Sequence, residues 1–268
     1  MDRVAALVVL AGYALSAVAL LVPGRFPTVA SKGRVWVGSA AAVHLVWLLG
    51  SLVDRRHPAG LGDALSATGF AVAVAYAWVG RSRLDALGMF LVPVAAVLVA
   101  TSFFVPAQSI PAIAETGFSV WLPIHLSLVF AGLGGFALSS VVGSVYLWSR
   151  QRLKQKRFAG MGRLPSLELL DRVQFRAMLF GFTALTLGIA AGGAWAIVAL
   201  DHDVWAGDPK VWFTVCVWGW YAAALQLRLV LGRRGRWTAW FSILGFGGMV
   251  FSLLGLNFLV GGFHAYGG

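Results

Sequence analysis

His125 and His264 are two of the five histidines in this 268-residue sequence, and each lies beside a long apolar segment. Neutral imidazole is a common iron ligand, and haem needs one ligand on each face together with apolar walls. A tryptophan-rich stretch between the two histidines, residues 201–221, could supply those walls. The alternative is that each histidine is an interfacial polar residue that bonds water.

The stretch 201–221 reads DHDVWAGDPKVWFTVCVWGWY and contains a predicted helix start. Asp208 is a good N-cap and Pro209 is a good first helical residue. Trp205 is therefore expected in the preceding loop, while Trp212 and Trp218 point in different directions from the helix. Because tryptophan favours membrane interfaces, an aromatic belt is the alternative explanation.

Cys216 lies on the same stripe as Trp212 and Trp220, at a spacing of four residues. It is the single cysteine, so the sequence has no CxxC motif, no disulfide framework and no thiolate metal site. We expect Cys216 to be a small buried apolar residue.

The other three histidines differ in their surroundings. His44 lies near the middle of an apolar segment, where a polar ionisable group is costly and usually faces the bundle interior. It could be a second haem ligand, a proton relay or a hydrogen-bonded core residue. His202 lies beside the tryptophans, and His57 lies in a polar connection where we expect it to be solvated.

Membrane-spanning helices must position these residues. The sequence is 59% hydrophobic and 12% charged, whereas a soluble domain has about 25% charged residues. Most apolar segments reach the roughly 17–25 residues that cross a bilayer. We therefore predict an all-α, polytopic membrane protein with eight transmembrane helices, forming a single integral-membrane domain over residues 1–268. The segments are 4–22, 35–53, 65–80, 86–105, 122–148, 177–200, 211–231 and 237–259.

The formal net charge of +11 is explained by membrane orientation rather than by nucleic-acid binding. Loops between eight spans alternate sides, and one side receives every Lys and Arg except Arg3, Arg55, Arg56 and Lys210. Lys and Arg in short loops mark the cytoplasmic side. Both termini and the 201–210 loop are therefore predicted to be extracytoplasmic. The basic run at 150–157 would also attract anionic lipid.

His125 and His264 reach a similar depth in this topology. His125 precedes the cytoplasmic Arg150 by about 25 residues, and His264 follows the cytoplasmic Arg236 by about 28. At about 1.5 Å per helical residue, each lies roughly 40 Å from the basic inner face. Two imidazoles from different helices are thus expected at one level beside the aromatic loop.

The cytoplasmic loop 149–176 contains LPSLELLDRVQF at 164–175. We predict a short interfacial helix there, with Ser166 as its N-cap and Glu168 in its first turn.

Several stretches of the second half carry a resemblance. They are WLPIHLSLVFAGLGGFALSSVVGSVYLW at 121–148, LPSLELLDRVQFRAMLFGFTALTLGIAAGGAWA at 164–196, WAGDPKVW at 205–212, YAAALQLR at 221–228, GRRGRWTAW at 232–240 and GLNFLVGGFHAY at 255–266. Through them, residues 121–268 resemble the cytochrome c assembly family of CcsA-type haem-handling membrane proteins. The mark of that family is a tryptophan-rich external WWD segment. Residues 1–105, the first four helices, match loosely in helix count and in the histidine of the second helix.

The resemblance implies that haem is presented at the outer membrane face, with His125 and His264 as the iron ligands. His44 is a further candidate cofactor-binding residue. Lys210 could pair with a haem propionate. The WWD segment would provide a face for the haem through Trp205, Asp208, Pro209, Lys210, Trp212 and Trp218.

Four positions depart from the family pattern, which is close to WxWDPKExW. Gly207 replaces its second tryptophan, Val211 its acidic residue, and Phe213 a later tryptophan. Gln226 replaces a membrane-embedded histidine that is proposed to help carry haem across the bilayer. Glutamine does not readily replace imidazole on iron, so the change at Gln226 affects haem transport through this chain more than external binding.

The resemblance implies a subunit that handles haem b in c-type cytochrome biogenesis at the bacterial inner membrane. A CcsB-like membrane partner and apocytochrome c, with its CxxCH thiols, are the implied partners, and any haem lyase activity would belong to the complex. A HemX- or YpjD-like accessory or regulatory protein linked to haem metabolism is the alternative. A transporter unrelated to haem is a third reading, which the expected lack of a buried ion pair in the spans disfavours.

Overall fold

The computed structural model describes residues 3–22, 32–55, 61–79, 82–104, 121–156, 165–199 and 205–252, and in these ranges every regular element is a helix. A short 3₁₀ helix, η1 (Ser82–Leu87), precedes the fourth α-helix. The all-α class predicted from the sequence is thereby confirmed for the described residues. The α-helices are α1 (Arg3–Leu21), α3 (Gly33–Arg55), α4 (Leu61–Val79), α5 (Gly88–Ser102), α7 (Trp121–Lys154), α8 (Leu167–Ala199), α10 (Pro209–Leu229) and α11 (Arg236–Val250).

These eight α-helices correspond one to one with the eight predicted apolar segments. Three of them contain a stretch that is long and apolar enough to cross a bilayer: Gly33–Ser51, Ile124–Lys154 and Leu167–Val198. The helical stretches Leu7–Leu21 and Gly88–Ser102 are apolar but shorter. The chain therefore has the helices of a membrane protein, while the total number of spans and the outward position of both termini remain predictions.

The interfacial helix predicted at 164–175 is instead the first part of α8. The helix runs without a break from Leu167 to Ala199, so the predicted amphipathic helix and the predicted span are one element. The predicted cap is present, because the backbone N–H of Leu169 donates to Ser166 Oγ at 3.3 Å. Nothing between residues 167 and 199 breaks a helix, since this range contains no proline.

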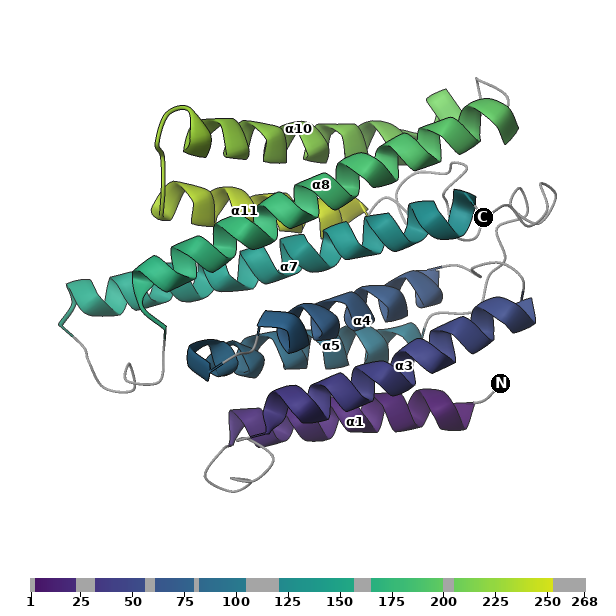
Figure 1. Cartoon of the computed structure of the whole chain (residues 1–268), viewed down its shortest axis with the longest axis horizontal. Coiled ribbons are helices and arrows are strands. Elements are labelled where there is room, and N and C mark those ends of the chain that lie inside the picture. The colour runs from purple at the N-terminus through teal and green to yellow at the C-terminus, as the bar shows by residue number, and fades with distance from the viewer. Residues whose placement is uncertain are drawn as a thin grey trace.

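Successive helices run in opposite directions along one long axis (Figure 1). In that view α1, α3, α4 and α5 form one group, and α7, α8, α10 and α11 form a second group above them. The start of α7, the end of α8 and the start of α10 all lie at the same end of the molecule. The turn between α10 and α11 lies at the opposite end.

Two buried apolar clusters hold the helices together. The first joins α1, α3, α4 and α5 to one side of α7 and to the first part of α8, and it includes Tyr13, Tyr76 and Leu91. The second joins α7, α8, α10 and α11, and its centre is the pair Phe136 and Tyr221, whose rings stack with centroids 3.7 Å apart. Helix α7 therefore belongs to both clusters and connects the two groups.

Glycines allow α7 to approach its neighbours closely. A Cβ placed on Gly135 would lie 2.9 Å from the Cα atom of Gly181 in α8. A Cβ on Gly134 would lie 2.9 Å from the Cβ of Ala71 in α4. Small residues at such positions let helices pack by backbone contact, as is typical of helix pairs in membranes.

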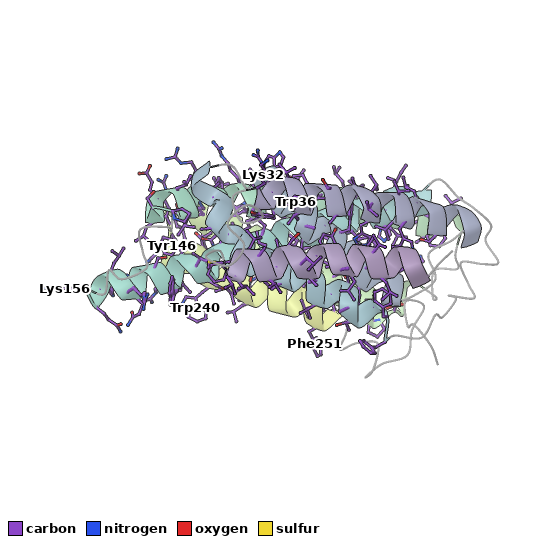
Figure 2. The ribbon with its side chains drawn as sticks, turned by 90° about the horizontal axis from the view of Figure 1, so that it is seen from below. Lys32, Trp36, Tyr146, Lys156, Trp240 and Phe251 are labelled. Carbon is purple, nitrogen blue, oxygen red and sulfur yellow. The ribbon has the colours of Figure 1, made fainter. Side chains whose placement is uncertain are left out.

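One end of the bundle is basic. Figure 2 shows Lys156 at the far tip of α7, with Tyr146 and Trp240 towards the same end and Phe251 farther along the molecule. The α10–α11 turn at this end carries the exposed side chains of Arg233 and Arg234. Arg233 and Arg236 lie over the ring of Trp237, at 5.8 and 5.6 Å from its centroid.

Candidate functional site

His125 lies in the first turns of α7 and contacts α8. Its Nδ1 atom lies 2.8 Å from the backbone carbonyl oxygen of Gly188. A carbonyl oxygen can only accept a hydrogen bond, so Nδ1 carries the proton in this arrangement. The neutral ring then has its lone pair on Nε2, which is the atom that can bind a metal.

The WWD-like segment folds as a compact turn at the start of α10. Oδ1 of Asp208 accepts a hydrogen bond from the backbone N–H of Lys210 at 2.7 Å, so the predicted N-cap and first-turn Pro209 are confirmed. Trp212 reaches back over the turn, and its Nε1–H donates to the carbonyl of Ala206 at 2.7 Å. Trp205 and Ala206 have helical backbone conformation, followed by a turn at Gly207. The sequence pattern had instead predicted a loop at Trp205.

The indole of Trp212 lies on the exposed side of this turn. Its side chain is 58% exposed although its ring N–H is already bonded to Ala206. The hydrogen bond of the ring N–H fixes the indole in place, and its flat apolar face is suited to contact with a planar apolar molecule. Asp208, by contrast, is 3% exposed and serves the backbone of the turn.

Lys210 is partly buried in the first turn of α10, just before the predicted apolar span. Burial lowers the pKa of Lys210 from 10.5 to about 8, and the nearby carboxylate of Asp208 opposes that shift. At neutral pH most of the ammonium group is still protonated, and an anion placed beside it would raise the pKa again.

Trp218 contacts a different face of α8 from the one that His125 contacts. Its Nε1–H donates to Thr186 Oγ1 at 2.9 Å, and its ring stacks on Phe182 with centroids 5.5 Å apart. Residues 186 and 188 are about 200° apart around a helix. The structure thus places α8 between Trp218 and His125 and does not bring these two predicted site residues into contact.

His44 is enclosed in the first helical group. Its side chain is 0% exposed, its Nδ1 lies 3.2 Å from Tyr13 Oη, and its Nε2 lies 2.9 Å from Ser66 Oγ. Its ring also packs against those of Trp47 and Phe70. Both ring nitrogens are engaged, so of the three roles considered for His44 the geometry matches a hydrogen-bonded core residue.

The outer face of α10 differs from expectation. Cys216 is exposed rather than buried, as is Trp212 one turn earlier on the same stripe, whereas Trp220 one turn later donates to the carbonyl of Phe241 in α11. Gln226 is exposed on the same helix. The position that resembles the membrane histidine of the family therefore points away from the described helices.

A buried ion pair at the basic end was not predicted. The guanidinium of Arg228 donates to both carboxylate oxygens of Asp171, at 2.8 and 2.7 Å, and also to Thr238 Oγ1 at 3.2 Å. The backbone N–H of Gly235 donates to the same carboxylate at 2.9 Å. Arg228 is 9% exposed and lies in the predicted span 211–231, whereas Asp171 precedes the predicted span 177–200, so this pair is not one that lies within the predicted spans. The one signal in the sequence was an arginine inside the apolar segment 211–231.

The described residues fit one side of a haem site. His125 places Nδ1 against a carbonyl, which makes Nε2 the ligating nitrogen of the neutral ring, and the outward ring of Trp212 and the side chain of Lys210 lie at the same end of the bundle, where α7 and α10 begin. His264, His202 and His57 lie outside the described residues. That His125 and His264 lie at one level therefore stays a prediction.

Comparison with known proteins agrees with the resemblance. A profile of the family described as cytochrome C assembly protein matches residues 60–264. The CcsA cytochrome c biogenesis protein of Guillardia theta is 32% identical over 165 residues, which are 56% of this chain and 54% of that protein. The protein of the same name from Prochlorococcus marinus strain MIT 9312 is 31% identical over 169 residues, again 56% and 54%.

A third relative, the CcsA protein of Synechococcus sp. strain JA-2-3B'a(2-13), is 41% identical over 105 residues, or 39% of this chain and 30% of that protein. The chain thus spans about half the length of the curated relatives it matches. Because the family profile covers most of the chain and includes α4 to α11, this chain belongs to the cytochrome c assembly protein family and is of the CcsA type.

Proposed function

We propose that this chain is a haem-handling subunit of c-type cytochrome biogenesis that presents haem at the outer membrane face. The observation that supports this most directly is the contact between His125 and Gly188, which leaves the iron-binding lone pair on Nε2. Membership of the cytochrome c assembly family gives the biological setting. In this proposal His125 and His264 are the two ligands of the iron of haem b.

The turn at residues 205–212 would form one wall of the haem site. Trp212 offers an exposed indole, and Trp205 precedes it in the same turn. Lys210 would stand beside a haem propionate, whose negative charge would offset the cost of burying the ammonium group. Asp208 and Pro209 would act indirectly by fixing the turn. Trp218, farther along α10, would hold this helix against α8 without touching the porphyrin.

Haem would be the cargo that this chain holds and transfers. The bond-forming groups are the thiols of the CxxCH motif in apocytochrome c, so the chain itself supplies binding, orientation and charge. A CcsB-like membrane partner would complete the complex, and the membrane would be the bacterial inner membrane. The basic end, with Arg233 and Arg234, would then face the cytoplasm.

Titration of the purified protein with haemin tests this proposal. Wild-type protein should develop the Soret band of bound haem. The double variant His125→Ala, His264→Ala should not develop it. His57→Ala is the matched control, because this histidine is expected to be solvated on the same side of the membrane. A wild-type protein that stays colourless and does not bind haemin would contradict the proposal.

A HemX- or YpjD-like accessory role is the second candidate, and Gln226 favours it. This exposed glutamine stands where the family has a membrane histidine, and its amide is a poor replacement for imidazole on iron. Expression in a strain that lacks its own CcsA-type protein separates the two roles. Restored c-type cytochromes support the first role, whereas haemin binding without restoration supports the accessory role.

A further inference from the structure

The imidazole of His125 lies where a side chain at position 192 of α8 would be. A Cβ placed on Gly192 would lie 2.5 Å from Nδ1 of His125 and 2.6 Å from its Cε1. Real Cβ atoms do not approach other atoms this closely, so the ring could not keep this position beside an alanine. A Cβ placed on the next residue, Gly193, would have no heavy atom within 4 Å.

Helix geometry explains why position 192 matters. Side chains in an α-helix lean towards its N-terminus, so a residue covers the surface of the turn before it. Position 192 therefore covers the carbonyl of Gly188, one turn earlier. That carbonyl is the group that accepts the hydrogen bond from Nδ1 of His125 at 2.8 Å. Because glycine has no side chain, position 192 leaves the Gly188 carbonyl open to a second hydrogen-bond donor from a neighbouring helix.

We propose that Gly192 is a positioning residue that opens the Gly188 carbonyl to His125 and thereby selects Nε2 as its ligating nitrogen. The tautomer of a histidine is set by the hydrogen bond that its other nitrogen makes. Such a bond also orients the ring and raises its basicity as a ligand. The choice of ligating atom is thus made on α8, by a residue that does not itself touch iron. That iron is the metal bound rests on the proposed function.

The first test uses haem-free protein. Nitrogen-15 NMR of labelled histidine distinguishes a ring protonated on Nδ1 from one protonated on Nε2, and a His125→Gln variant assigns the signal. Wild type and Gly193→Ala should show a proton on Nδ1 of His125, whereas Gly192→Ala should lose this form. If Gly192→Ala keeps the wild-type signal, the proposal is overturned.

A double-variant comparison guards against simple misfolding. Gly192→Ala should lower the thermal unfolding midpoint in wild-type protein but should have little effect when His125→Ala has already removed the ring. Gly193→Ala should have the same small effect in both backgrounds. An equal loss of stability for Gly192→Ala in both backgrounds would mean that the clash is not with His125, and would overturn the proposal.

Haemin binding then connects the tautomer to the proposed ligand. Gly192→Ala should weaken haemin binding by about tenfold and shift the midpoint potential of the bound iron, as loss of a hydrogen bond behind a ligating histidine does. Gly193→Ala should leave both unchanged. If wild type binds no haemin, the proposed function fails while the NMR result still decides the role of Gly192. If Gly192→Ala changes the tautomer but not the binding, Gly192 does not position a ligand.

Discussion

Individual side chains at the end of the bundle where α7 and α10 begin combine possible binding roles with structural ones. His125 places Nδ1 against a carbonyl of α8, and Trp212 uses its ring N–H to close a turn while its face stays outward. Asp208 acts mainly as a cap. The residue types were visible in the sequence, but the hydrogen bond that gives His125 its tautomer joins residues 63 positions apart and leaves no local pattern.

Lys210 gives this end of the molecule a pH dependence. Its pKa is lowered by burial to about 8, whereas in the unfolded chain it is near 10.5. Between these two values the unfolded chain binds more protons than the folded chain, so stability should rise as pH rises from about 8 to about 10.5.

Thermal unfolding in detergent across this pH range measures the effect. Lys210→Met should remove the rise that wild type shows, because methionine keeps the apolar stem without the titrating group. Identical pH profiles for the variant and wild type would show that Lys210 has no lowered pKa in the folded protein.

At the scale of elements, the ion pair of Asp171 and Arg228 fixes how α8, α10 and α11 meet. The carboxylate binds a side chain of α10 and the backbone of the turn before α11, where Gly235 has a positive φ of 67°. The hydroxyl of Tyr146 from α7 covers Gly235 so closely that a Cβ there would collide with it. The start of α11 is therefore set by three other helices.

Breaking this pair should be costly because one charge would remain buried. Asp171→Asn should destabilise the protein by about 3–5 kcal/mol, measured as a fall in resistance to denaturant in mixed micelles. The control is Arg172→Gln, one residue along, which removes an ion pair with Glu168 whose side chains are 56% and 83% exposed. That variant should change stability by less than about 0.5 kcal/mol. Equal effects of the two variants would show that the Asp171 pair is not stabilising.

Sequence patterns were a good guide to helices and a poor guide to their contacts. The eight apolar segments marked all eight α-helices of the described ranges, because in lipid a spanning segment has to satisfy its own backbone. The cap of Asp208 and the cap of Ser166 were also local enough to recognise. The continuity of α8 and the exposure of Cys216 depend on what packs alongside, and no local rule contains that information.

At the scale of the whole molecule, the antiparallel order of helices separates the two ends by charge. Helices α7, α8, α10 and α11 run in alternating directions, and the basic residues of the described ranges concentrate at the end that contains Lys156 (Figures 1 and 2). This arrangement predicts that the start of α10 is extracytoplasmic and the start of α8 cytoplasmic.

Cysteine labelling in intact cells checks that orientation. In a Cys216→Ser background, Gly207→Cys should react with a membrane-impermeant maleimide, because residue 207 is exposed at the predicted outer end. Ser166→Cys, exposed at the opposite end, should react only after the cells are broken. The reverse pattern would place His125 on the cytoplasmic side and would remove the proposed function.

Helix α7 is shared by both apolar clusters, and this has a consequence for how the protein could be assembled. A chain interrupted between Phe104 and Trp121 would leave α1, α3, α4 and α5 on one polypeptide and α7, α8, α10 and α11 on another. The second piece would retain α7 as a ready surface, with Gly134 shaped to receive Ala71 of the first. The protein is thus built so that two separately made fragments could recognise each other and recombine within a bilayer.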